Sequence, residues 1–146
     1  MSRARLILAL LCLLPLVLAG CGGPKSIARD TPQATGEALV AAIRAGDYDA
    51  AAAGFDFEEY AQRENPDWGT FAPQARKEII GELQKAKATE LQALSGMMGT
   101  DVSVGEGTIE GDRATVRVAV GPTMLRLQMI RKDGLWYILS VEEGAG

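Results

Sequence analysis

The chain has 146 residues, a formal net charge of −4 and a hydrophobic fraction of 47%. This length suits one compact domain with a short additional segment and is too small for two domains of ordinary size. It contains no histidine, so the side chain that most often titrates near neutral pH is missing, and its acidic balance disfavours nucleic acid and anionic lipid surfaces as partners.

The first 20 residues are predicted to be a secretory signal peptide. Arg3 and Arg5 precede an apolar run from Leu6 to Leu18, and small residues follow that run. This order is typical of a cleaved signal, and the run is shorter than the roughly 20 residues that a helix needs to cross a bilayer. Removal of residues 1–20 leaves 13 basic residues against 19 acidic ones, a formal charge of −6.

The sequence Leu18-Ala19-Gly20-Cys21 resembles the bacterial lipobox. The resemblance implies that the Cys21 thiol takes up diacylglycerol, so that the mature protein is a lipoprotein held to a membrane outside the cytoplasm by palmitate or similar acyl chains. Gly22 stands where an aspartate commonly retains such proteins in the inner membrane, so the resemblance favours the periplasmic side of the outer membrane in a Gram-negative cell. The alternative is a secreted protein cleaved near Ala19, with Cys21 as a free thiol.

Residues 21–30 are predicted to form a flexible tether, because they contain two glycines and a proline and no sustained apolar period. Residues 31–143 are predicted to form the domain. Cys12 leaves with the signal and Cys21 is blocked by lipid, so we expect no disulfide, and the stability of the domain has to come from its core.

The first half of the domain is predicted to be helical. Thr31 can cap a helix that begins at Pro32 and ends at Gly46, and Asp47 can cap a short second helix. A long helix is expected from about Pro73 to the glycines at positions 96 and 99.

In the second half the apolar period changes from near 3.6 to 2, which predicts strands at residues 102–109, 113–120, 124–131 and 135–142. Two-residue turns separate them: Gly111-Asp112, Gly121-Pro122 and Asp133-Gly134. The fold class is therefore α+β, with N-terminal helices packed on a curved antiparallel meander of four strands.

The turns also fix the register of the strands. They place Val116 opposite both Gly107 and Leu127, and they place Met129 opposite Ile138. The face toward the helices then consists of Ile109, Ala114, Val116, Val118, Val120, Leu125, Leu127, Met129, Trp136 and Ile138.

The opposite face is predicted to carry a cross-strand row of Glu106, Arg117 and Arg126, which is typical of a solvated sheet surface. It is nevertheless more apolar than an exposed sheet needs to be, so a second copy of the chain or an envelope protein could cover it. The apolar members of this face are Met124, Ile130, Tyr137, Leu139 and Val141.

Gly105 and Gly107 are predicted to share the inner face and to leave a hollow in the first strand. One interpretation is the floor of a ligand pocket, with Trp136 and Tyr60 as further candidate lining residues. The other is close approach of a helix or a bend in the sheet.

The sequence offers no convincing catalytic, metal or cofactor site. Phosphate loops, nucleophile elbows and dinucleotide fingerprints are absent, and no histidine can activate a serine. Carboxylates concentrate between residues 56 and 67, but their spacing fits neither an EF-hand nor a zinc ligand set, and such clusters usually face solvent: Asp56, Glu58, Glu59, Glu64 and Asp67.

Two short motifs within this order of elements resemble the nuclear-transport-factor-two-like superfamily, which has a cystatin-like fold. They are Ala45-Gly46-Asp47-Tyr48-Asp49-Ala50-Ala51 and Lys132-Asp133-Gly134-Leu135-Trp136-Tyr137-Ile138. The nearest likeness is to lumazine-binding-like lipoprotein domains of unknown function. The resemblance implies a curved sheet wrapped around helices into a cone, with dimers often formed through the sheet.

Three functions remain open at this point. An accessory or interaction domain of the cell envelope predicts a filled cone, and a carrier of a small apolar ligand predicts a closed cavity above Gly105 and Gly107. An isomerase-like or cyclase-like enzyme predicts a buried carboxylate that points into that cavity. We favour the interaction domain, then the carrier.

Overall fold

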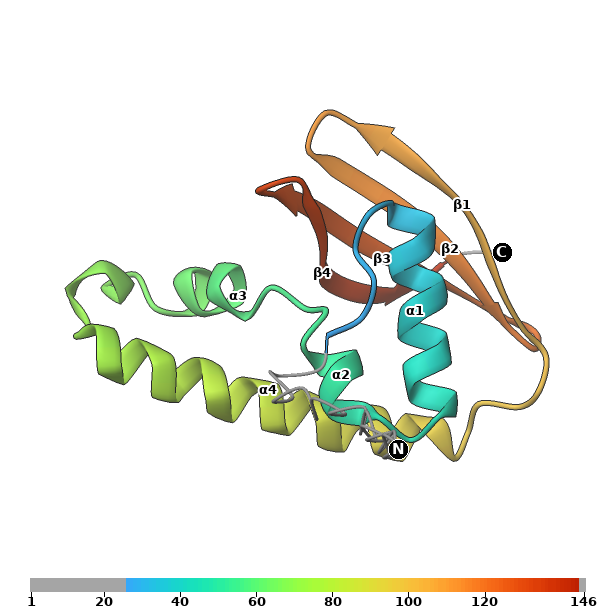
Figure 1. Ribbon diagram of the computed structural model, residues 1–146, viewed down its shortest axis with the longest axis horizontal. Coiled ribbons are helices and arrows are strands. Elements are labelled where there is room, and N and C mark those ends of the chain that lie inside the picture. Colours follow the sequence, from blue (N-terminus) through green and yellow to red (C-terminus); the bar gives the residue numbers. More distant parts are fainter. Residues whose placement is uncertain (1–25, 145–146) are drawn as a thin grey trace, which may run out of the picture.

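The computed structural model describes residues 26–144. The predicted signal peptide, Cys21 and the first half of the predicted tether lie outside the described residues. Within them, helices occupy the first half of the chain and an antiparallel sheet the second half (Figure 1). The predicted α+β class is confirmed.

Between residues 26 and 144, four α-helices and one short 3-10 helix precede the sheet. Their bounds are α1 Pro32–Arg44, α2 Tyr48–Ala52, α3 Phe57–Glu64, η1 Trp68–Thr70 and α4 Pro73–Ser95. Four strands follow: β1 Val102–Glu110, β2 Arg113–Val120, β3 Thr123–Lys132 and β4 Leu135–Glu143.

The predicted helix caps are present. The Ala34 amide donates to Thr31 Oγ1 at 3.1 Å, and the Ala50 amide donates to an Asp47 carboxylate oxygen at 3.3 Å. Each bond satisfies an amide that has no partner within its helix. Gly46, with φ of +73°, supplies the left-handed residue on which the chain turns from α1 toward α2.

The sheet has the order β1-β2-β3-β4, and every neighbouring pair is antiparallel. Val116 lies opposite both Gly107 and Leu127, as predicted, and Met129 lies opposite Ile138. The two-residue turns thus set the central register of the sheet.

Two β-bulges change which residues share a face. In β1, Gly105 and Glu106 both lie opposite Arg117, because Val104 pairs with Val118 and Gly107 with Val116. The prediction that Gly105 and Gly107 share the inner face is therefore wrong, since one extra residue between them breaks the alternation.

The second bulge is at Leu139 in β4, where Ser140 pairs with Gln128 and Ile138 pairs with Met129. The extra residue places Val141 opposite Leu127, which is on the inner face and 2% exposed. Val141 was predicted on the outer face, and this prediction is wrong for the same reason as in β1.

The core lies between α1 and the inner face of the sheet, with α2 and the C-terminal half of α4 closing it below (Figure 1). The inner side chains of β2, β3 and β4 form its centre, and those of Val116, Leu127, Met129 and Ile138 are at most 2% exposed. Burying each of these side chains stabilises the fold by about 1.5 to 3 kcal/mol, so this face holds the domain together.

The domain begins before its predicted start. Ile27 is only 9% exposed and belongs to the core, and the Trp136 amide donates to the Arg29 carbonyl oxygen at 2.9 Å. Residues 26–30 were predicted as flexible tether. That is corrected because Ile27 packs against Gly54, where a Cβ would overlap the Ile27 side chain.

The N-terminal half of α4 projects past the sheet and packs under α3 (Figure 1). Within α4, Leu91 is buried, whereas Ile79, Ile80 and Leu83 are half-buried. Between residues 26 and 144, no helix combines the length and apolar character needed to cross a bilayer.

Candidate functional site

A groove opens between α3, α4 and the outer edge of the sheet at β4. We call it the α3–α4–β4 groove; its volume is about 380 Å³. Its apolar wall consists of Phe55, Phe57, Tyr60, Leu83, Leu139 and Val141. The half of α4 that projects past the sheet carries α3, so these two helices lie beside the β4 edge of the sheet (Figure 1).

The chain itself pairs with the first half of the β4 edge. The Ile138 amide donates to the Gly54 carbonyl oxygen at 2.9 Å, and the Asp56 amide donates to the Ile138 carbonyl oxygen at 2.9 Å. After Asp56 the chain turns into α3. Within residues 26–144, the pairing along this edge stops at Ile138, so the second half of β4 borders the groove with an open edge.

The bulge at Leu139 places two apolar side chains on this edge of the sheet. Leu139 and Val141 both line the groove, and Val141 is 42% exposed. On the opposite wall Tyr60 is 41% exposed. Large apolar groups exposed on both sides of one depression are typical of a binding surface.

Asp56 is the most deeply buried carboxylate of the groove, with its side chain 7% exposed. One carboxylate oxygen caps α3 by accepting from the Glu59 amide at 3.0 Å, and the other lies 2.5 Å from Lys132 Nζ. Glu59 adds a second carboxylate 3.6 Å from the same ammonium. Both oxygens of Asp56 are therefore engaged.

Lys132 is held in its charged form by these two carboxylates. Partial burial lowers its pKa, but the hydrogen bond from Lys132 to Asp56 and the negative charges of Asp56 and Glu59 outweigh that effect and raise the pKa above the ordinary value of 10.5. A lysine in this state is a poor proton acceptor at neutral pH, so the pair stabilises the start of α3 rather than forming an acid-base couple.

Two further cations lie over aromatic rings of the wall. Lys87 Nζ is 5.2 Å from the centre of the Phe55 ring and 2.6 Å from Glu90, and the Arg63 guanidinium is 5.9 Å from the centre of the Tyr60 ring. Such contacts hold the cations beside the apolar surface. The groove thus combines an apolar wall with a charged rim.

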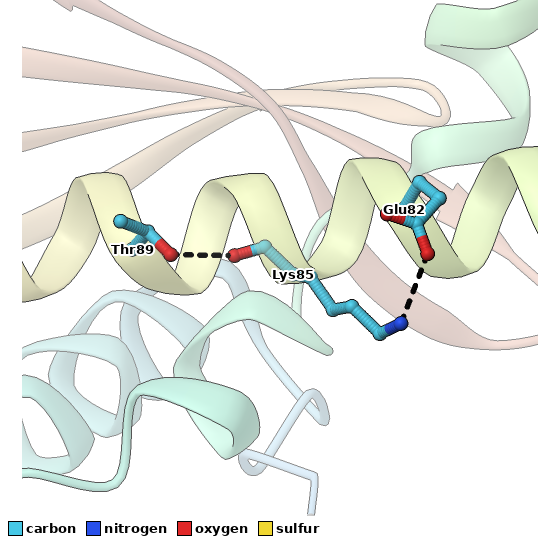
Figure 2. A network of polar contacts seen from close by, with 3 residues as sticks. All are labelled: Glu82, Lys85 and Thr89. Carbon is cyan, nitrogen blue, oxygen red and sulfur yellow. Dashed lines mark hydrogen bonds and ion pairs between the residues drawn. The ribbon is translucent and has the colours of Figure 1, made fainter.

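A different side of α4 carries an exposed polar network, in contrast to the groove. There Lys85 Nζ donates to Glu82 at 2.9 Å and Thr89 Oγ1 donates to the Lys85 carbonyl oxygen at 3.1 Å (Figure 2). The hydrogen bond and the charge of Glu82 raise the pKa of Lys85 above its ordinary value. Exposed pairs of this kind stabilise little, so this network marks a solvated surface.

The structure does not bring the four predicted pocket residues together. Tyr60 lines the groove, whereas Trp136 is a core residue, 3% exposed, with the Arg131 guanidinium 5.5 Å from its ring centre. Gly105 sits in the β1 bulge beside Arg117. Gly107 lies under Pro32, so at this position the structure shows the close approach of a helix.

Other residues of the groove were not predicted as site residues. Phe55 and Phe57 belong to no motif in the sequence, and Val141 was assigned to the wrong face of the sheet. Within residues 26–144, no group of three or more Cys, Asp or Glu side chains is placed to hold a metal ion.

No protein-family model and no curated protein sequence matches the chain. Among solved structures it resembles RPA3114, a SEC-C motif containing protein from Rhodopseudomonas palustris, with 19% identity, coverage of 81% of this chain and 82% of that chain, and a TM-score of 0.50. It also resembles a structure from Campylobacter jejuni named as an NTF2-like transpeptidase, with 18% identity, coverage of 70% and 91%, and a TM-score of 0.44. At such identities a likeness concerns the fold, so function has to be argued from the site.

Proposed function

We propose that the chain is a bacterial lipoprotein whose single domain, of the nuclear-transport-factor-two-like kind, binds a partner of the cell envelope without catalysis. The observation that carries this proposal is the α3–α4–β4 groove, where an open strand edge and an exposed apolar wall meet. Membrane anchoring rests on the lipobox resemblance at Cys21, which lies outside the described residues.

The partner is an extended protein segment that adds to the free half of β4. Residues Gly54–Asp56 already pair with β4 as far as Ile138, and an added strand would continue that pairing along the edge. Main-chain hydrogen bonds give such complexes their affinity, and alternate side chains entering an adjacent groove give them specificity. The apolar wall and Tyr60 are the anchoring surface for those side chains.

The chemistry of the groove supports binding rather than catalysis. Its one deeply buried carboxylate has both oxygens engaged, and Lys132 is held protonated. A general base needs a free acceptor with a pKa near the working pH, and a positioned proton to take. Asp56 offers no free acceptor, and the raised pKa of Lys132 keeps it from accepting a proton at neutral pH.

A second candidate is a carrier of a small apolar ligand in the same groove. Ligand pockets range from about 300 to 1,000 Å³, so 380 Å³ would accept a small molecule. A carrier differs from an interaction domain in what copurifies with it. For a carrier, native mass spectrometry would detect a bound molecule of a few hundred daltons, and photo-crosslinking would give no protein adduct.

Photo-crosslinking in native membranes tests the docking surface. A photoreactive amino acid replaces Val141 in one variant and Ile109 in a matched control. Both positions are exposed aliphatic residues on the inner face, but they lie on opposite edge strands. We expect a discrete protein adduct from position 141 and little from position 109.

Equal adducts from both positions, or none from position 141, would contradict docking in the groove. A third variant with the photoreactive group at Met124, on the outer sheet face, tests the predicted contact through that face. An adduct there with a second copy of the chain, and none at position 141, would favour the dimer instead.

A further inference from the structure

The point at which the chain enters the domain is firmly held. Ile27 is buried against Gly54, and the Arg29 carbonyl oxygen accepts from the Trp136 amide. The Arg29 guanidinium lies 4.4 Å from the centre of the Tyr137 ring. Ser26 is therefore a fixed point on the surface of the domain.

Little chain separates this point from the proposed lipid. Five peptide units join Cys21 to Ser26, and five extended residues reach about 17 Å. A compact domain of about 120 residues has a radius of gyration near 13.5 Å and hence a diameter of about 35 Å. To bring its far side to the membrane, the chain would have to follow half the circumference, about 55 Å by the same estimate.

We propose that the end of the domain from which Ser26 emerges faces the bilayer that holds Cys21, and that the β2–β3 turn points away from it. This proposal rests on the proposed lipidation of Cys21. Ser26 shares a surface hollow, which we call the exit hollow, with Phe57, Glu58, Ile80, Lys132 and Tyr137. The lipid surface is thus the partner of the exit hollow.

The two ends of the sheet are well separated. β3 runs from Thr123, beside the β2–β3 turn, to Lys132 in the exit hollow. Its ten residues span about 30 Å at roughly 3.3 Å per residue. One end of the sheet is therefore membrane-proximal and the other distal.

The tether, rather than charge, sets this orientation. The exit hollow contains Arg29 and Lys132, but Glu58 and Asp133 oppose them, and the mature chain carries a formal charge of −6. A surface of mixed charge gains little from anionic headgroups, and what it gains is screened by salt. The contact suits neutral headgroups and is insensitive to ionic strength.

The orientation also places the α3–α4–β4 groove. Phe55, Asp56 and Phe57 line both the exit hollow and the groove. The groove therefore begins near the membrane-proximal end and runs along the second half of β4, where Val141 pairs with Leu127 in the middle of β3. A segment that docks there has to be accessible within about half the length of the sheet, or about 15 Å, of the membrane-proximal end.

Energy transfer from the lipidated protein to headgroup-labelled phosphatidylcholine vesicles tests the orientation. Because the mature chain has no cysteine other than Cys21, Glu58→Cys and Thr123→Cys each offer one free thiol for a donor dye. Both positions are exposed, one in the exit hollow and one at the distal end. We expect about twofold or greater transfer from position 58 relative to position 123, because the ends lie about 30 Å apart.

A lengthened tether is the matched control. About 20 flexible Gly and Ser residues inserted between Gly23 and Pro24 add a root-mean-square reach of about 25 Å and a contour length beyond half the circumference. The difference between the two positions should then disappear. Equal transfer with the native tether, or a difference that survives the insertion, would overturn the proposal.

Two checks separate this result from a failure of lipidation. Each sample is first shown by mass spectrometry to carry the lipid on Cys21, so a sample without lipid tests only the proposed anchoring. Transfer is then measured between about 50 and 500 mM salt, where a tether-set orientation gives constant values. A strong fall with salt would show that charge sets the orientation and would overturn the tether mechanism.

Discussion

Replacing Gly107 by alanine tests whether the space between β1 and the start of α1 is filled. At this position the sequence also allowed the floor of a ligand pocket. A Cβ on Gly107 would lie 2.9 Å from Pro32 Cβ and 3.3 Å from Val116 Cγ2. Pro32 is the first residue of α1, and its ring cannot rotate away, so the helix or the strand has to shift. Overpacking of this kind costs about 1 to 3 kcal/mol of the free energy of unfolding.

Gly105→Ala is the matched control two residues earlier. There a Cβ would meet the Arg117 carbonyl oxygen at 3.4 Å, which is ordinary contact. Alanine in place of a glycine within a strand stabilises by about 0.5 to 1 kcal/mol when nothing clashes. We therefore expect opposite signs from two chemically identical substitutions.

Thermal and urea unfolding of the lipid-free domain measure both variants. For a domain of about 120 residues, 1 kcal/mol shifts the Tm by about 4 °C. Gly107→Ala should lower the Tm by about 4 to 12 °C, and Gly105→Ala should raise it by about 2 to 4 °C. A Gly107→Ala variant as stable as the parent would contradict this reasoning, because it would show that space exists above β1. That result would favour a carrier that binds an apolar ligand in a cavity on the inner face of the sheet.

Substitutions at Ile27, Asp56 and Lys132 test the entry of the chain and the start of α3. Ile27→Ala should lower the free energy of unfolding by about 2 kcal/mol, because core Ile→Ala changes cost about 2 to 5 kcal/mol and this side chain lies at the edge of the core. Ser26→Ala, measured in the same urea titration, should have no effect. Asp56→Ala should cost about 1 kcal/mol more than Asp56→Asn, because asparagine keeps the cap on the Glu59 amide; equal losses would contradict the cap. Lys132→Met should lower stability at pH 7 to 9 and lose its effect at higher pH. The pKa of Lys132 is raised, so its contribution is complete below 10.5 and disappears as the pH rises through the folded-state value; a pH-independent loss would count against the ion pair.

Much of the fold could be predicted from local signals. Thr31 before Pro32 and the Asp133-Gly134 turn each specify a conformation with few alternatives, and the structure confirms them. The alternation in β2 needed no tertiary information, because both neighbouring strands pair with β2 through two-residue turns.

The bulges and the groove could not be predicted in this way. A bulge adds one residue without a distinctive sequence. Strict alternation from Leu135 therefore assigned Val141 to the outer face, whereas the extra residue at Leu139 places it on the inner face. Ile27 gave no periodic signal because it is a single buried residue in an extended segment. The groove depends on how far α4 projects past β4, which is a property of tertiary packing.

The anchoring of Cys21 underlies both the proposed function and the proposed orientation, and intact-mass and peptide mass spectrometry of the protein purified from its own membranes tests it most directly. The proposal predicts a mature chain that begins at Cys21 and carries diacylglycerol, and a Cys21→Ser variant that stays uncleaved or leaves the membrane without lipid. A native chain with an unmodified Cys21 thiol, or a Cys21→Ser variant that is still processed and membrane-bound, would contradict it.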